Sequence, residues 1–314
     1  MYSRNHQVLS SITNFQAQWG IRHFARSVSR GHTTAIMTAD SSLPLPPLNG
    51  ATMLRALFKR PRRLAGVPTP RTAYRLEQID ADQLRRYRQV LGFRDDGIPL
   101  TYWYLLAQRA QVATMLDDAF PFRLPGTVHT ANTLQMLGTA RRDAPLLLAT
   151  SVHIRPPSDN GAVYAELETV ARQDHADVFS CHSTYLLVRG QRGPRRQQRG
   201  TEAALPAVAR WQLGRRSGRE YAAVSGDWNP IHLWNWSARL MGMKRPIIHG
   251  MHTLARACAE LEGASGQRVV ALDGRFKAPA QLGSELVLAA DLGTRNFSVG
   301  AGGRPVAEGS FRFA

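Results

Sequence analysis

Apolar residues between positions 100 and 120 recur at steps of three and four, which predicts a helix over roughly 100–119 with one apolar face. The repeating positions are Tyr102, Leu106, Ala110, Ala113, Leu116 and Phe120. Pro121 and Pro125 are expected to end this helix, because proline interrupts helical hydrogen bonding. A shorter helix is predicted over 78–92, where Gly92 provides the C-terminal stop.

Beyond residue 125 the pattern changes to short runs rich in Leu, Val, Thr and Tyr, separated by Gly, Pro, Asp or Asn. Such runs are typical of antiparallel strands. In the first half they predict strands near 127–137, 146–154, 162–172 and 177–188. In the second half they predict a strand near 205–213, a helix from Gly250 to about Leu261, and strands near 268–277, 284–292, 295–300 and 305–313. This order of elements predicts two copies of one α+β unit, although the halves show no evident sequence identity.

Basic, polar stretches lie before and between these two units. Residues 189–200 combine three Gly, one Pro and several Arg, and are expected to form a linker between a first folded half, 76–188, and a second, 201–314. Residues 1–75 are expected to form a flexible basic extension. Within it, 41–75 is rich in Pro and Arg and predicts an extended, solvated arm. Residues 1–39 contain no Asp or Glu, which suits a transit peptide, a disordered tail, or a translation start at Met37 instead of Met1.

Composition narrows the classes of function. No run of eighteen apolar residues is present, so no membrane span is expected. Two cysteines, Cys181 and Cys258, are too few for a disulfide framework and lack metal-ligand spacing, which predicts a reducing compartment and no metal site. We therefore expect a cytoplasmic protein, or a mitochondrial one if the N-terminus is a transit peptide.

The net charge of +17 can attract nucleic acid or a phosphate-bearing ligand. Zinc-finger spacing, RNA-binding signatures and heptad-linked basic regions are missing from the sequence, so we expect no nucleic-acid role.

Candidate chemistry is concentrated in residues 221–251. Asp227 and His232 lie on either side of an Asn229-Pro230 turn, and Gly226 allows the chain to bend before them. Asn-Pro is a helix-start signal, and predicts a helix from Pro230 to Met241 closed by Gly242. A carboxylate and an imidazole on one tight turn can hold a common water, which the imidazole deprotonates.

A second element follows at His249-Gly250-Met251, at the start of the next predicted helix. Helix N-termini carry unpaired N–H groups and the positive end of the helix dipole. A glycine there allows a ligand carbonyl to approach the backbone, so the Gly250 N–H is a candidate oxyanion donor.

The run Ser225-Gly226-Asp227-Trp228-Asn229-Pro230-Ile231-His232, followed by Ala238 and Ile248-His249-Gly250-Met251, resembles the hydratase-2 motif of MaoC-like (R)-specific enoyl-CoA hydratases. The resemblance implies a double hot-dog fold of the α+β class, in which each half wraps an antiparallel sheet around a long helix, with a degenerate first half. It implies that Asp227 and His232 activate water for syn addition to a trans-2-enoyl thioester, that the Gly250 N–H binds the thioester oxygen, and that Asn229 shapes the turn. It implies no cofactor.

Some positions depart from the family pattern or allow a purely structural role. Leu233-Trp234-Asn235-Trp236 follows the motif His where many members have Asp-Pro. The two tryptophans could alter the acyl channel or pack the helix, and we expect both to pack the helix. Only Thr253 and Cys258 could supply the side chain that supports the motif His in some members. His129 and His153 fall in predicted strands and are interpreted as structural.

The acyl carrier could be coenzyme A or acyl carrier protein, and a homodimer is plausible; acyl chain length is left open. A hot-dog thioesterase is the alternative enzyme. A non-catalytic module that binds acyl thioesters or polyanions is the alternative outside enzymes, although a module of that kind has no need of the Asp227–His232 pair.

Overall fold

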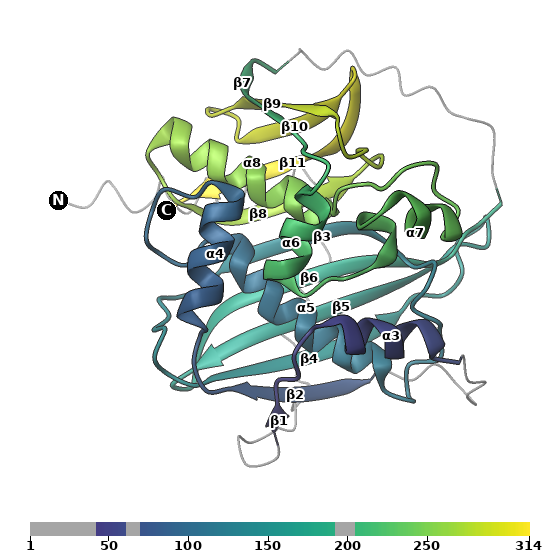
Figure 1. The fold of residues 1–314 in the computed structure, drawn as a ribbon. Coiled ribbons are helices and arrows are strands. Elements are labelled where there is room, and N and C mark those ends of the chain that lie inside the picture. The colour runs from purple at the N-terminus through teal and green to yellow at the C-terminus, as the bar shows by residue number, and fades with distance from the viewer. Residues whose placement is uncertain (1–41, 61–69, 192–204) are drawn as a thin grey trace. The chain divides into compact units, whose positions relative to one another are not determined.

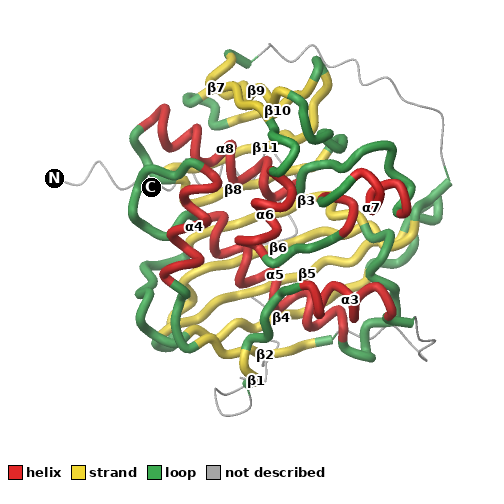
Figure 2. Tube along the Cα trace, in the orientation of Figure 1, coloured by secondary structure: helices red, strands yellow, loops and turns green. Residues whose placement is uncertain are grey.

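Strands from both halves of the chain join in one continuous sheet. The computed structural model describes residues 42–60, 70–191 and 205–314. Within them the sheet has eleven strands in the order β1-β2-β4-β5-β6-β3-β8-β11-β10-β9-β7, and the helices lie over one face of it (Figures 1 and 2). All neighbours are antiparallel except β1 and β2.

The first half contributes β1 (Leu43–Pro44), α3 (Gly50–Phe58), β2 (Arg71–Leu76), α4 (Ala81–Leu91), α5 (Leu100–Leu116), β3 (Val128–Met136), β4 (Leu146–Ile154), β5 (Val163–Gln173) and β6 (Ala176–Val188). The second contributes β7 (Ala207–Gln212), α6 (Ser217–Ser225), the 3-10 helix η3 (Pro230–His232), α7 (Asn235–Leu240), α8 (Gly250–Ser265), β8 (Val269–Phe276), β9 (Glu285–Asp291), β10 (Asn296–Ala301) and β11 (Arg304–Phe313).

The two halves have the same topology. If β2–β6 are counted as strands one to five, their order in space is 1-3-4-5-2, and β7–β11 show the same order from the opposite edge. The halves meet where β3 pairs with β8, with Leu134 opposite Leu272. The main helix of each half, α5 or α8, lies in the chain between its first and second strands and packs on its own strands. The predicted repeat of one α+β unit, with the double hot-dog architecture, is therefore confirmed.

Helix α5 is buried on nearly all sides, so the prediction of a single apolar face is wrong. The sheet covers one side of it. On the other side Tyr102 packs edge-on against Tyr87 of α4, with ring centroids 5.4 Å apart. Arg109 donates from Nε to the Pro46 carbonyl (3.0 Å) and from Nη2 to the Leu45 carbonyl (2.9 Å), which fixes an N-terminal segment over the helix.

The expected extended, solvated arm is also wrong for residues 42–60. Leu43–Pro44 pairs in parallel with β2, and α3 follows, capped by the Asn49 side chain. Leu45 and Leu48 are buried, because they cover α5 and the neighbouring cluster of apolar side chains. Residues 1–41, 61–69 and 192–204 lie outside the described residues, as do the transit-peptide interpretation and most of the predicted linker. The domain boundaries stay predictions.

The predicted helix from Pro230 to Met241 is broken in two. After η3, Trp234 adopts an extended backbone and α7 begins at Asn235. Ser237 causes this break, because its Oγ donates to the Pro230 carbonyl (2.7 Å) and accepts from the Trp234 N–H (3.3 Å). Among the described residues, no helix has the length and apolar character needed to cross a bilayer.

Candidate active site

The turn that carries Asp227 begins at the end of α6. Gly226 has φ +79°, and its N–H donates to the Ala222 carbonyl (2.8 Å). An added Cβ would be strained at this φ and would overlap the Leu48 carbonyl oxygen. Asn229 then caps η3, since its side chain accepts from the Ile231 N–H (3.4 Å), and Pro230 is the first residue of that short helix.

The Asp227 carboxylate has two fixed partners. Its Oδ1 accepts from the Asn229 N–H (3.2 Å), and its Oδ2 accepts from Nε2 of Gln108 (3.0 Å). Gln108 is a buried residue of α5, so the first half of the chain contributes directly to this site. No pattern in the sequence predicts this contact, because 119 residues separate the two positions.

His232 is buried and presents a defined tautomer. Its Nδ1 lies 2.9 Å from the carbonyl oxygen of Ile247, which can only accept, so Nδ1 carries the proton. Nε2 is therefore left unprotonated, as a general base requires. The sequence offers Thr253 and Cys258 as candidates to support this histidine. In the structure the backbone carbonyl of Ile247 has that role instead.

A second histidine, His249, links these elements. Its ring stacks on that of His232 with centroids 3.7 Å apart, and its Nε2 donates to the backbone carbonyl of Asp227 (2.9 Å). The carboxylate turn and the N-terminus of α8 are thereby held together. The sequence pattern singled out the His249-Gly250 pair but assigned a role to the glycine alone.

Gly250 is the first residue of α8, where N–H groups lack helical partners. A Cβ at this position would lie 2.6 Å from Cε1 of Phe276, so only glycine allows β8 to pack this closely. Phe276 in turn lies 5.1 Å, centroid to centroid, from the ring of His129.

His129 belongs to an aromatic cluster beside the site. Its ring stacks on Tyr185 (4.5 Å) and Tyr104 (5.9 Å). Burial lowers its pKa to about 4, although the Asp227 carboxylate acts in the opposite direction. The first half of the chain thus supplies an aromatic wall near Asp227. His153 is an exposed residue of β4.

The electrostatics of the site determine the protonation states of Asp227 and His232. Burial by itself raises the pKa of Asp227, but His249, His232, the Asn229 N–H and Gln108 together hold it below its ordinary value. Burial and the adjacent His249 lower the pKa of His232 to about 3, against the opposing effect of Asp227. At neutral pH the site therefore contains a carboxylate and a neutral imidazole.

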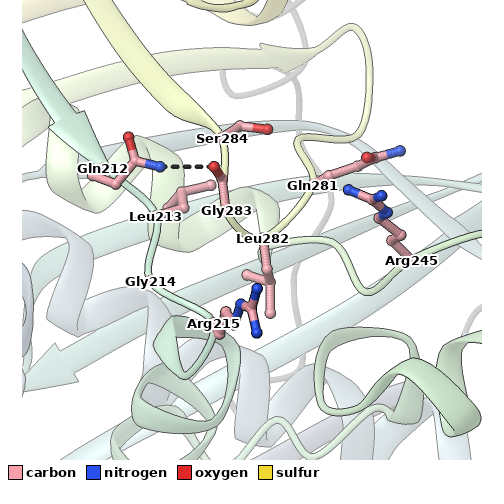
Figure 3. A pocket seen from close by; sticks show the side chains of 9 residues that line it. All are labelled: Gln212, Leu213, Gly214, Arg215, Arg245, Gln281, Leu282, Gly283 and Ser284. Carbon is pink, nitrogen blue, oxygen red and sulfur yellow. Dashed lines mark hydrogen bonds between the residues drawn. The ribbon is translucent and has the colours of Figure 1, made fainter.

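A cavity of about 470 Å³ lies at the ends of β7 and β9, outside the Asp227–His232 pair (Figure 3). It is lined by Gln212, Leu213, Gly214, Arg215, Arg245, Gln281, Leu282, Gly283 and Ser284. No group of three or more His, Cys, Asp or Glu among the described residues could hold a metal ion.

Comparisons with known proteins show what this chain is similar to. Residues 197–296 match the family described as MaoC like domain. The 3-hydroxyacyl-thioester dehydratase X of Mycobacterium tuberculosis is 27% identical over 213 residues, which cover 65% of this chain and 74% of that protein.

Solved structures give the same fold. The crystal structure of HtdX of Mycobacterium tuberculosis superposes with a TM-score of 0.63 at 24% identity, over 77% of this chain and 100% of that one. A conserved hypothetical protein of the same organism, described as having a double hotdog fold, superposes with a TM-score of 0.51 at 11% identity, over 82% of this chain and 97% of that one. The predicted resemblance is confirmed: residues 197–296 match the MaoC like domain family, and the chain has the double hot-dog fold.

Proposed function

We propose that this protein is a hydro-lyase that interconverts a trans-2-enoyl thioester and the (R)-3-hydroxyacyl thioester. The observation that carries the proposal is the arrangement around one turn: an ionised Asp227, an unprotonated Nε2 on His232, and the N-terminus of α8 at Gly250, joined through the His249 contacts. The MaoC-like domain and the dehydratase relative from Mycobacterium tuberculosis support the same reaction.

In the proposed mechanism the Asp227 carboxylate orients a water through the lone pairs left free by Gln108 and Asn229. Nε2 of His232 removes a proton from this water as its oxygen bonds to C3 of the substrate. Negative charge develops on the thioester oxygen, where the Gly250 N–H stabilises it; one such donor typically contributes about 3–4 kcal/mol. The imidazolium then returns the proton to C2, so both parts of the water add to one face.

The aromatic cluster of the first half supports a composite site. The first half has no Asp-x-Asn-Pro-x-His motif of its own, but it supplies Gln108 and the rings of His129 and Tyr185. We infer that it acts as the wall of the acyl site while 201–314 carries the chemistry. Coenzyme A and acyl carrier protein are the candidate carriers of the acyl group.

The test is a hydration assay with trans-2-enoyl thioesters of several chain lengths, followed by chiral analysis. We expect loss of the enoyl absorbance and formation of the (R)-3-hydroxyacyl thioester without release of free thiol. Thiol release measured with a thiol-reactive dye would indicate a thioesterase instead. Substrate that stays unchanged at every length would contradict the proposal and favour the non-catalytic module.

Location and assembly are further proposals. The free, buried thiols of Cys181 and Cys258 support a reducing compartment such as the cytoplasm. A homodimer is testable by light scattering, with the mass of one chain as the contrary result.

A further inference from the structure

Four large apolar side chains are exposed on and beside α7, directly after the catalytic turn. Their exposed fractions are 41% for Trp234, 62% for Trp236, 79% for Leu240 and 36% for Met241. The two indole rings stack on one another with centroids 5.9 Å apart. The expectation that both tryptophans pack the helix is therefore wrong. Apolar side chains gathered in this way on a surface indicate a binding site.

Six basic residues lie in the same stretch of chain. They are Arg215, Arg216, Arg219, Arg239, Lys244 and Arg245. Within the described part of the chain, none of the six pairs with a carboxylate. Between residues 211 and 252 the only acidic residues are Glu220 and the partly buried Asp227. This stretch of chain therefore carries a net positive charge, which attracts an acidic partner.

Ser237 joins this surface to the catalytic turn, and Arg219 joins it to Leu233, the residue that follows His232. Arg219 donates from Nη1 to the Leu233 carbonyl (2.8 Å), and its guanidinium lies over the Trp234 ring at 5.9 Å. Ser237 of α7 donates to the Pro230 carbonyl (2.7 Å). Arg215 and Arg245 also line the cavity in Figure 3. We define the α7 face as Trp234, Trp236, Leu240 and Met241 with the six basic residues.

The charge on the α7 face argues against a second copy of this chain as its occupant. A two-fold interface would place the same cationic patch against itself, and like charges across an interface are costly. The face instead fits a partner that is acidic and partly apolar. Trp, Met and Arg are also the residue types enriched where proteins bind one another.

We propose that the α7 face docks an acidic acyl carrier protein, which delivers the enoyl group to the turn that carries Asp227 and His232. This inference rests on the proposed function, because acyl carrier protein is the acidic protein among the candidate carriers of that reaction. A coenzyme A ester uses the same chemistry at its thioester but has no protein surface to cover exposed tryptophans.

The kinetic test compares crotonyl-coenzyme A with a crotonyl-loaded bacterial acyl carrier protein at low ionic strength. The variants are Trp236→Ser, Arg239→Glu and Lys244→Glu. The matched control is Arg304→Glu, an exposed arginine at the start of β11. For each α7-face variant we expect the ratio of kcat/KM values, carrier protein over coenzyme A, to fall by about tenfold or more through KM. The control is expected to keep the ratio of the unchanged protein.

Two kinetic results would overturn the docking site while leaving the hydratase assignment intact. One is that no α7-face variant changes kcat/KM for either substrate. The other is an equal loss for both substrates, which would mean that the cations bind the phosphates of coenzyme A and not a carrier protein.

A binding experiment covers the case in which neither thioester is hydrated. Calorimetric titration of the Asp227→Asn protein with the holo carrier protein is expected to give a complex that salt weakens and that Trp236→Ser disrupts. Such a complex, together with no hydration of either thioester by the unchanged protein, would refute the proposed reaction and keep the docking surface. No heat of binding at low salt would refute the docking surface whatever the activity.

Discussion

One backbone carbonyl decides which nitrogen of His232 is free to act as a base. Because Ile247 fixes the proton on Nδ1, Nε2 is available whenever the imidazole is neutral. Burial and the adjacent His249 lower the pKa of His232 to about 3, and the pKa of Asp227 is also lowered. Both groups are therefore in the reactive state over a wide range of pH.

We expect kcat/KM for hydration to stay flat between about pH 5 and pH 8, since no essential group in the site titrates there. A free histidine would instead give an inflection near its ordinary value of about 6.5. A pH–rate profile of kcat/KM distinguishes the two. An acid limb centred near the ordinary histidine value would contradict the neutral, buried imidazole.

Gln108 positions the Asp227 carboxylate from the first half of the chain. Gln108→Leu removes a hydrogen bond to a charged group, usually worth about 1.5–3 kcal/mol. We expect kcat to fall by about tenfold or more with little change in KM, and the acid limb to move to higher pH because the carboxylate loses a partner that lowers its pKa.

Gln111→Leu is the matched control for this change. Gln111 lies on the same helix and is buried, but it contacts Thr169 and Cys181 and not Asp227. It is expected to lower stability and leave the pH profile unchanged. A Gln108→Leu protein with the unchanged profile would show that the contact with Asp227 is only structural.

The N-terminus of helix α8 affects both the packing of β8 and the proposed chemistry, through Gly250. In Gly250→Ala the new Cβ would lie 2.6 Å from the Phe276 ring, so β8 or the helix must shift. We expect a stability loss of about 1–3 kcal/mol from overpacking. Because the shift displaces the proposed oxyanion donor, kcat is expected to fall by more than the stability loss explains.

Gly263→Ala on the same helix provides the comparison. Gly263 is exposed, and an added Cβ would come no closer than 3.6 Å to Arg94. This change is expected to stabilise the helix by up to about 1 kcal/mol without altering kcat. Thermal melts and initial rates of both proteins check the pair. Equal kinetics in the two variants would remove Gly250 from the proposed mechanism.

Elements with a strong local pattern could be predicted from the sequence. The strand predicted over 146–154 has those bounds in β4, where fully buried and less buried residues alternate. Gly92 ends α4 as expected, with φ +77°. Helix α6 was missed, since its buried residues Tyr221, Ala222, Val224 and Ser225 form too short a pattern. The break before α7 depends on the Ser237–Pro230 hydrogen bond, which no periodicity reveals.

In the candidate site, too, only the residues of a local pattern could be predicted from the sequence. The motif residues from Gly226 to His232 are local, and the sequence placed them on one turn. The roles of Gln108 and His129 depend on packing between halves that are distant in the chain, so a pattern within either half could not supply them. The burial of α5 likewise comes from segments outside the helix.

The buried histidines make the stability of the whole protein depend on pH. The pKa values of His232 and His252 are lowered to about 3, and that of His249 is lowered as well, in each case chiefly by burial. The unfolded chain therefore binds more protons than the folded one below about pH 6.5, and stability is lost as the pH falls. Glu262 acts in the opposite direction, because burial raises its pKa to about 7.

We expect the free energy of unfolding to fall between about pH 6.5 and pH 4.5, with each of these histidines contributing up to about 1.4 kcal/mol per pH unit and Glu262 offsetting one of them. Urea denaturation across this range measures the slope. The His252→Gln protein, which lacks one buried imidazole outside the proposed chemistry, is expected to show a shallower slope. Constant stability down to pH 4.5 would contradict the burial of these rings in neutral form.

The most direct test of the proposed reaction is the hydration of crotonyl-coenzyme A by the unchanged protein and by Asp227→Asn, with chiral analysis of the product. Asn keeps the shape of Asp but cannot supply the carboxylate. We expect (R)-3-hydroxybutyryl thioester from the unchanged protein and a rate lower by about 10²–10⁴ in the variant, at an unchanged melting temperature. A variant that forms the (R) product at a near-normal rate would contradict the assignment of Asp227 and the mechanism built on it.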